Sequence, residues 1–428
     1  MNLDRTIPPA VSLLDDFHIE KPELRVMKNG MPLNVIQAGD EDVVRFDIII
    51  RGGQLSQTQP LQASLTNRLL REGSRRYTSS EIAERLDYYG AWLDLASSVN
   101  YGYVTLYSLN KYFDQTMDVL ASIIKEPTFE EDKLEIAVDV SRQNFLVNEE
   151  RVDILAHKRM IQSLFGAEHS LGRFAVKSDF DRINRDVIQQ LYDRTYNSSN
   201  ATTYVSGKVT PEIVRCIERH FGDERWGKTS QPIRLDISKP MVEEGKRFVV
   251  EKENVMQSAI KMGCFTLPNR HEDYLKLKVL VTLFGGYFGS RLMSNIREEK
   301  GYTYGISSGV ISYPEFSVLA IGTEADNSYI APIIKEVYNE IDRLQNENVT
   351  MQELEMVRNY MLGDICRSYE GAFSLSDAWI FIKSTGHSDD YFEQTIQTVR
   401  NITVEDMRSM AQKHLSKEAL KEVIAGKL

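Results

Sequence analysis

The amino-acid sequence repeats itself across its two halves, and this repeat constrains the fold more than any other feature. The segment from Ile183 to Val209 aligns without a gap with the segment from Ile402 to Leu428, at an offset of 219 residues. In both copies, apolar residues at three- and four-residue spacing predict a helix, and a short apolar run ending in Gly-Lys predicts a strand. We interpret the repeat as a tandem duplication.

Each half also contains strand-like segments that precede most of its helices. They are residues 24–27, 45–51, 91–96 and 103–109 in the first half, and 248–251, 259–265, 304–310 and 316–322 in the second. Strands that are segregated from a later run of helices favour an α+β fold. We therefore predict two homologous α+β units, each a mostly antiparallel sheet with helices packed on one face.

The length of 428 residues agrees with two units, because a single hydrophobic core stops growing near ~250–300 residues. The polar, proline-containing stretch from 226 to 246 has the composition of a linker. We place the first unit at residues 1–225, the linker at 226–246 and the second unit at 247–428.

Charge and composition exclude several classes of protein. A net charge of −11, without a long basic cluster, makes nucleic acid an unfavourable partner. Apolar runs such as 279–284 are far shorter than the ~20 residues that cross a bilayer. Three widely spaced cysteines suggest neither a disulfide framework nor a cysteine zinc site. Residues 1–20 lack the pattern of a secretory signal, so we expect a cytoplasmic protein, or a periplasmic one if a signal peptide has been removed.

Common catalytic motifs are absent from the sequence. It has no phosphate-binding loop, no nucleophile elbow and no zinc-binding His-Glu-x-x-His or His-x-x-Glu-His helix. No two of the seven histidines are four residues apart, the spacing that places two imidazoles on one helix face. The glycine cluster at Gly285, Gly286 and Gly289 predicts a break between two helices rather than a cofactor site.

A more informative stretch, RLMSNIREEKGYTYG, runs from Arg291 to Gly305. Here the sequence resembles the pitrilysin and insulysin superfamily of zinc peptidases, whose metal lies on an inverted His-x-x-Glu-His helix. The phrase FGAEHSLGR at 165–173 and the terminal Gly-Lys strands also have counterparts in that family, so the resemblance covers nearly the whole chain. It implies two homologous α+β units and a role in proteolysis.

The resemblance also implies that the metal-binding helix of this chain is degenerate. Gly73-Ser74 aligns with the end of the family's zinc motif, which places Ser64 and Arg68 at the two histidines and Asn67 at the glutamate. A further glutamate ligand falls at Gln143 or Asn144. A guanidinium is always charged and donates only, so no metal is expected in this chain. Glu149 and Glu150, nearby, are interpreted as a solvated helix face rather than substitute ligands.

The second half retains another family feature. Arg297 and Tyr304 match, in type and spacing, an Arg/Tyr pair that holds the substrate backbone and the developing oxyanion in the family. In some members, two chains divide the work, one with the zinc motif and one with the Arg/Tyr pair. The resemblance therefore implies a non-catalytic subunit of a heterodimeric zinc peptidase, which binds peptide beside a homologous, zinc-bearing partner. Whether the chain also forms homodimers in isolation stays open.

Two other interpretations remain. The chain could be a structural or peptide-binding scaffold subunit of a larger complex with no role in proteolysis, in which Arg297 and Tyr304 serve packing only. It could also be an autonomous hydrolase with a different site. The partner found with the chain, or zinc found in the isolated chain, distinguishes these possibilities.

Overall fold

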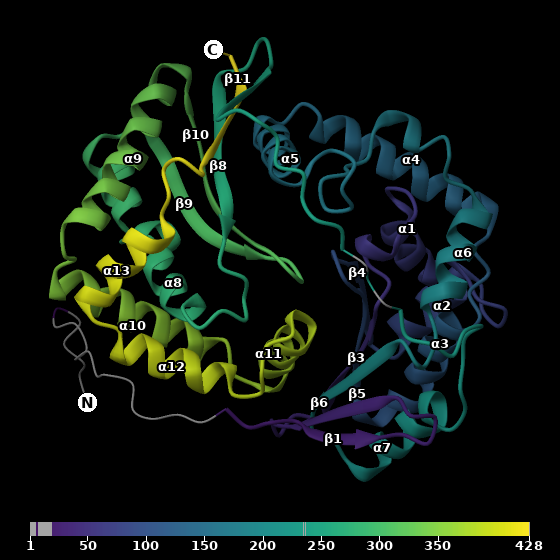
Figure 1. Ribbon diagram of the computed structural model, residues 1–428. Coiled ribbons are helices and arrows are strands. Elements are labelled where there is room, and N and C mark those ends of the chain that lie inside the picture. Colours follow the sequence, from purple (N-terminus) through teal and green to yellow (C-terminus); the bar gives the residue numbers. More distant parts are fainter. Residues whose placement is uncertain (1–5, 7–18, 234, 236, 428) are drawn as a thin grey trace.

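The structure is a computed structural model that describes residues 6, 19–233, 235 and 237–427. Two β-sheets form the centres of two lobes (Figure 1). The prediction about the amino-terminal segment falls on residues 1–20, most of which lie outside the described residues. Within the described ranges, no helix combines the length and the apolar character needed to cross a membrane.

The first sheet has six strands in the order β1-β2-β6-β3-β5-β4. Every pairing is antiparallel except that of β2 with β6. One face carries the apolar side chains of the first core, because alternate residues of a strand point to the same side. The strands are β1 Glu23–Val26, β2 Pro32–Gln37, β3 Val43–Ile50, β4 Trp92–Ser97, β5 Gly102–Leu109 and β6 Ala201–Gly207.

The second sheet repeats this topology, and the described residues contain no counterpart of β1 in it. Its order is β7-β11-β8-β10-β9, and only β7 and β11 are parallel. Each strand takes the place of one strand of the first sheet, which supports the duplication. The strands are β7 Arg247–Glu251, β8 Gln257–Thr266, β9 Thr303–Ser312, β10 Ser317–Asp326 and β11 Lys421–Gly426.

The glycine of the repeated Gly-Lys pair has the same structural role in both halves. Gly207 has φ +112° and Gly426 has φ +140°, backbone conformations that residues other than glycine rarely adopt. A Cβ atom would lie 2.4 Å from the Val43 carbonyl oxygen at Gly207 and 2.1 Å from the Ser258 hydroxyl at Gly426. Both central strands therefore end at a residue that has to be glycine.

In both halves, a short set of helices interrupts the strands, and a longer run of helices precedes the last strand of the sheet. Most of them pack on the core face of their own sheet; in α3, for example, Phe113, Met117 and Leu120 recur at helical spacing and are buried. The helices of the first half are α1 Gln62–Arg68, α2 Ser79–Tyr88, α3 Phe113–Lys125, α4 Glu131–Asn148, α5 Val152–Phe165, α6 Arg185–Thr195 and α7 Pro211–Ile217. Those of the second half are α8 Tyr274–Val281, α9 Ile330–Asn346, α10 Met351–Arg367, α11 Ala372–Thr385, α12 Tyr391–Asn401 and α13 Val404–His414.

One helix of each half crosses to the sheet of the other half. Helix α5 lies against β8 and β11, where its Met160 and Phe165 pack with Val423 (Figure 1). Helix α11 lies against β6 and β2, and its Trp379 belongs to the same apolar cluster as Tyr204 of β6. These two helices cover the sheet faces opposite the main helical layers. The halves are thus joined by a reciprocal exchange of helices.

The predicted fold class is confirmed, because two mostly antiparallel sheets with the same strand order each carry helices on one face. The exchange of α5 and α11 adds a partial cover on the other face, which the sequence analysis did not predict. The boundaries at 225, 226–246 and 247 stay a prediction.

Candidate functional site

The residues at the family's zinc-motif positions lie on α1, and the burial of its apolar residues decides how they point. Leu65 and Leu69 are buried in the first core, so Ser64 and Arg68, one residue earlier in each turn, face outward. Asn67 points inward, and its Nδ2 donates to the Tyr196 hydroxyl at 3.2 Å and the Tyr103 carbonyl at 3.3 Å. The amide therefore completes a buried hydrogen-bond group.

The second helix of this region, α4, also lacks metal ligands at the expected place. Gln143 and Asn144 are both exposed amides on α4, which packs beside α1. Glu149 forms an ion pair with Lys158, and Glu150 forms one with Lys252 at 2.7 Å. These acids serve surface ion pairs at the end of α4, in agreement with the interpretation of a solvated helix face.

Zinc does not fit the residues at this position. It requires neutral nitrogen, thiolate or carboxylate donors, whereas the exposed face of α1 offers a serine hydroxyl and the guanidinium of Arg68. Asn67, at the general-base position, cannot accept a proton from water and is engaged with Tyr196. The family's hydrolytic step therefore cannot be assigned to these residues.

The structure brings Arg297 and Tyr304 together in the second lobe. Arg297 lies in the π-helical segment Met293–Glu299, and its Nε donates to the Tyr304 carbonyl at 3.0 Å. Its guanidinium carbon also lies 4.5 Å from the centre of the Phe288 ring. The Tyr304 side chain is 92% exposed, which leaves its phenol open to a binding partner.

A short connection between helix and strand fixes this arrangement. Ile296 is buried, and its carbonyl accepts from the Tyr302 amide at 3.0 Å. Gly301, at φ +64°, allows the chain to turn between them. Tyr304 is the second residue of β9, an edge strand that pairs only with β10 and leaves its other side without a strand partner among the described residues.

Phe288 is a candidate contact residue that the sequence analysis did not identify. It lies in the glycine cluster, which was interpreted only as a helix break, and the helical structure does stop at Gly286 and resume at Arg291. The ring is exposed and stacks against Arg297. An exposed aromatic residue between glycines, close to an arginine in sequence, was the available signal.

The two sets of residues occupy different lobes. Ser64, Asn67 and Arg68 belong to α1 of the first lobe, whereas Arg297 lies in the helical segment before β9 and Tyr304 lies in β9 of the second lobe (Figure 1). Within one chain, neither a hydrogen bond nor an ion pair joins these two sets of described residues. Arg297 and Tyr304 thus form a surface of their own.

Comparisons with known proteins find relatives for both halves of the chain. Residues 35–172 match the family described as insulinase (peptidase family M16), and residues 182–361 match the peptidase M16 inactive domain. A Bacillus subtilis protein called uncharacterized zinc protease YmxG is 25% identical over 71% of this chain and 73% of its own length. A Helicobacter pylori protein called non-peptidase homolog YmxG is 24% identical over 73% of this chain and 72% of its own length.

Solved structures agree with the fold. The peptidase M16 inactive domain from Pseudomonas fluorescens superposes with a TM-score of 0.85 at 19% identity, covering 95% of this chain and 98% of that one. A protease from Helicobacter pylori superposes with a TM-score of 0.83 at 15% identity, covering 96% of this chain and all of its own. The duplicated α+β fold, the Arg297-Tyr304 segment and these matches lead to one conclusion: the chain belongs to the M16 family of insulinase-like peptidases and their inactive homologues.

Proposed function

We propose that the chain is a non-catalytic subunit of a heterodimeric zinc metallopeptidase, which holds an extended peptide while a homologous, zinc-bearing partner cleaves it. The observation that carries the proposal is the combination of an Arg297-Tyr304 pair on an exposed strand edge with an α1 that cannot bind zinc. The partner supplies the metal, and this chain supplies contacts to the substrate.

The edge of β9 suits an extended peptide, because unpaired main-chain groups can extend the sheet by one strand. Tyr304 would donate its phenol hydrogen to a peptide carbonyl oxygen. Arg297 is oriented by the Tyr304 carbonyl, which accepts from its Nε, and by the Phe288 ring. Its Nη1 lies 3.7 Å from the Glu298 carboxylate, a long contact that a peptide carbonyl could replace. Fixed donors of this kind stabilise negative charge that develops on a carbonyl oxygen.

The test is to mix the purified chain with the homologous subunit that carries His-x-x-Glu-His and to measure peptide cleavage. Arg297→Ala and Tyr304→Phe should each lower kcat/KM by about 10²–10³-fold, the loss typical of removing one oxyanion donor. The matched controls are Arg367→Ala and Tyr88→Phe, which change exposed residues elsewhere and should leave cleavage unchanged. Cleavage that survives both Arg297→Ala and Tyr304→Phe removes the mechanistic proposal.

The second candidate is a structural or peptide-binding scaffold with no role in proteolysis. The hydrogen bond from Arg297 to the Tyr304 carbonyl favours it, because that contact also explains the pair as local packing. Purification of the chain with its natural partners separates the two. A zinc-bearing homologue of similar length supports the peptidase subunit, and a larger assembly without peptidase activity supports the scaffold. Cleavage by the isolated chain would instead indicate an autonomous hydrolase.

The same purification addresses two further proposals. We place the chain in the cytoplasm, where fractionation should find it together with its partner. In the absence of that partner, the two-lobed chain can pair with a second copy, and light scattering of the isolated protein would show a dimer. A monomer in isolation that becomes a heterodimer on mixing would restrict association to the homologous partner.

A further inference from the structure

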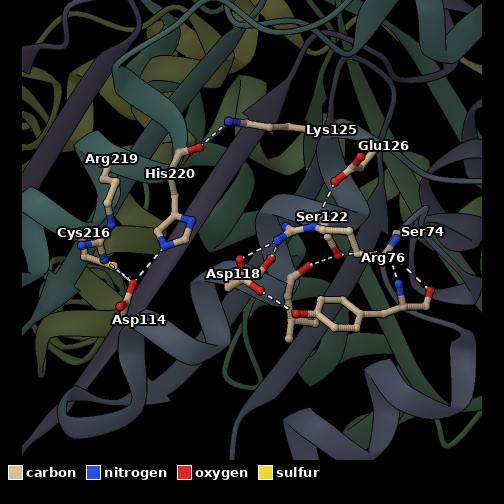
Figure 2. Close-up of polar contacts among 12 residues, drawn as sticks. Ser74, Arg76, Asp114, Asp118, Ser122, Lys125, Glu126, Cys216, Arg219 and His220 are labelled. Atoms are coloured by element: carbon tan, nitrogen blue, oxygen red, sulfur yellow. Dashed lines mark hydrogen bonds and ion pairs between the residues drawn. The ribbon is translucent and has the colours of Figure 1, made fainter.

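Three side chains with metal-binding atoms meet on the first lobe, away from α1 and α4. They are Asp114 of α3, Cys216 of α7 and His220 of the turn that follows α7 (Figure 2). The carboxylate oxygen, the thiol sulfur and the imidazole nitrogen all lie within 4.8 Å of one another. The Asp114 Oδ1 is 3.5 Å from the Cys216 Sγ and 2.9 Å from the His220 Nε2.

The local backbone holds these donors in place. Helix α7 ends in a π-helical turn, Glu218–Gly222, in which the Asp223 amide donates to the Glu218 carbonyl at 2.9 Å. Cys216 and His220 are four residues apart, so both face α3. Lys125, at the end of α3, donates to the His220 carbonyl and fixes the turn from the other side. Single π-helical turns within helices are frequent at functional sites.

We propose that Asp114, Cys216 and His220 bind a divalent transition-metal ion of the zinc type. Thiolate, imidazole and carboxylate together are a donor set that such an ion prefers. With metal bonds of about 2.0–2.3 Å, tetrahedral donors lie roughly 3.3–3.7 Å apart. The separations of 3.5 Å and 2.9 Å are therefore within a few tenths of an ångström of that requirement.

The surroundings agree with a three-residue site that leaves one position to water. Cys216 is buried, and Asp114, in the first turn of α3, is exposed enough for an ion to enter from solvent. Coordination replaces the thiol hydrogen of Cys216, and that proton leaves to bulk water.

Arg219 competes with a metal ion for Asp114. Its guanidinium donates to the same Oδ1, and its side chain is 59% exposed, so it can move into solvent when an ion binds (Figure 2). Asp118, one turn further along α3, is engaged with Arg76 and with the Tyr77 hydroxyl at 2.7 Å, and it is not available to the site. Arg219 is thus the residue whose removal should tighten metal binding.

The experiment strips the full-length chain of metal with a chelator and titrates it with Co²⁺ and then Zn²⁺. We expect about one Co²⁺ per chain and the charge-transfer absorption of a thiolate bound to cobalt, which Zn²⁺ abolishes by displacement. Cys216→Ser should remove the absorption, and His220→Gln should weaken binding by more than the ~10–100-fold typical of losing an outer-shell partner. Cys366→Ser and His271→Gln are the matched controls and should bind as the wild type does.

A second variant keeps the proposal testable if a ligand substitution disturbs folding. Arg219→Gln removes only an exposed ion pair and should tighten Co²⁺ binding several-fold, because Asp114 is released. Unchanged or weaker binding in Arg219→Gln, or no stoichiometric Co²⁺ in the wild type, overturns the site. Metal that persists in Cys216→Ser also overturns it. These outcomes are independent of peptide cleavage with a partner, so they test the site separately from the proposed function. Metal that is lost in Cys216→Ser belongs to this site, so zinc in the isolated chain indicates an autonomous hydrolase only if it persists in that variant.

Discussion

Arg45 and Asp47 form a buried ion pair on the face of the first sheet that α11 covers, and replacing Arg45 with Met should destabilise the protein strongly. The Arg45 Nη2 lies 2.9 Å from the Asp47 Oδ1, and the two side chains are only 7% and 3% exposed. Arg45 also reaches Asp377 of α11 at 2.6 Å, and Asp47 accepts from the Thr105 hydroxyl at 2.7 Å. The pair therefore joins the sheet of one half to a helix of the other.

The expected magnitude follows from what each substitution leaves behind. Arg45→Met leaves the Asp47 carboxylate buried without its cation, which costs about 3–5 kcal/mol of unfolding free energy. Asp377→Asn removes a partner that is 66% exposed, and its cost should stay below about 1 kcal/mol. The double variant Arg45→Met/Asp47→Leu removes both charges and should recover most of the loss, because a hydrophobic replacement of a buried pair is often neutral.

The cost of Arg45→Met should also depend on pH. Burial raises the pKa of Asp47, and the charge of Arg45 opposes that shift, so removing Arg45 lets the pKa rise further. A carboxyl whose folded pKa exceeds its unfolded value of about 3.9 favours the fold below that value, and this contribution is lost as pH rises through the folded pKa. The variant should therefore be less destabilised at pH 5 than at pH 8.

The measurement is urea denaturation of wild type and variants between pH 5 and pH 8. The slope of the transition is compared as well, because a changed slope indicates that the halves unfold separately. A cost below about 1 kcal/mol for Arg45→Met, or a cost that does not change with pH, would refute the reasoning. The double variant checks that the lost charge, rather than lost packing, carries the effect.

Two further predictions concern stability. Burial, together with nearby positive charges, lowers the pKa of His387 to about 4. The contribution of neutral His387 to the unfolding free energy is therefore fully present above the unfolded pKa of about 6.5 and falls by up to about 2 kcal/mol toward pH 4, after allowance for solvent screening. His387→Phe should remove this fall, which is measured by denaturation at several pH values. Gly207→Ala places a Cβ 2.4 Å from the Val43 carbonyl oxygen at a positive φ and should lower the unfolding free energy by at least about 1–3 kcal/mol in urea denaturation. The control Gly363→Ala adds a Cβ in open space within a helix and should raise the unfolding free energy by about 0.5–1 kcal/mol. Equal effects of the two substitutions would contradict the strain at Gly207.

The sequence carried enough information for the fold because the duplication is written in its periodicity. The offset that relates Ile183 to Ile402 also relates β6 to β11, and the predicted strands lie within a few residues of eight observed ones. The strand β2 was not predicted, because Pro32–Gln37 mixes polar and apolar residues and follows closely after β1. The exchange of α5 and α11 was not predicted either, because the apolar face of a helix does not specify which sheet the helix covers.

The candidate sites were predictable to different degrees. Arg297 and Tyr304 are seven residues apart, so their proximity was within reach of a local motif, and the structure joins them through a single hydrogen bond. The donors on α3 and α7 come from segments about one hundred residues apart, and a search for paired histidines cannot find one histidine, one cysteine and one aspartate. Tertiary structure alone brings such groups together.

The reciprocal position of α5 and α11 makes each half of the protein depend on the other. The two helices occupy equivalent places in the repeat, and each covers the sheet of the other copy. Two separate single-unit chains with this structure would have to trade a helix, as domain-swapped dimers do. Within one chain, the exchange of α5 and α11 is intramolecular, and the effective concentration of the second unit is high. A lone unit would present an uncovered apolar sheet face, so we expect neither half of this protein to be stable as a separate unit.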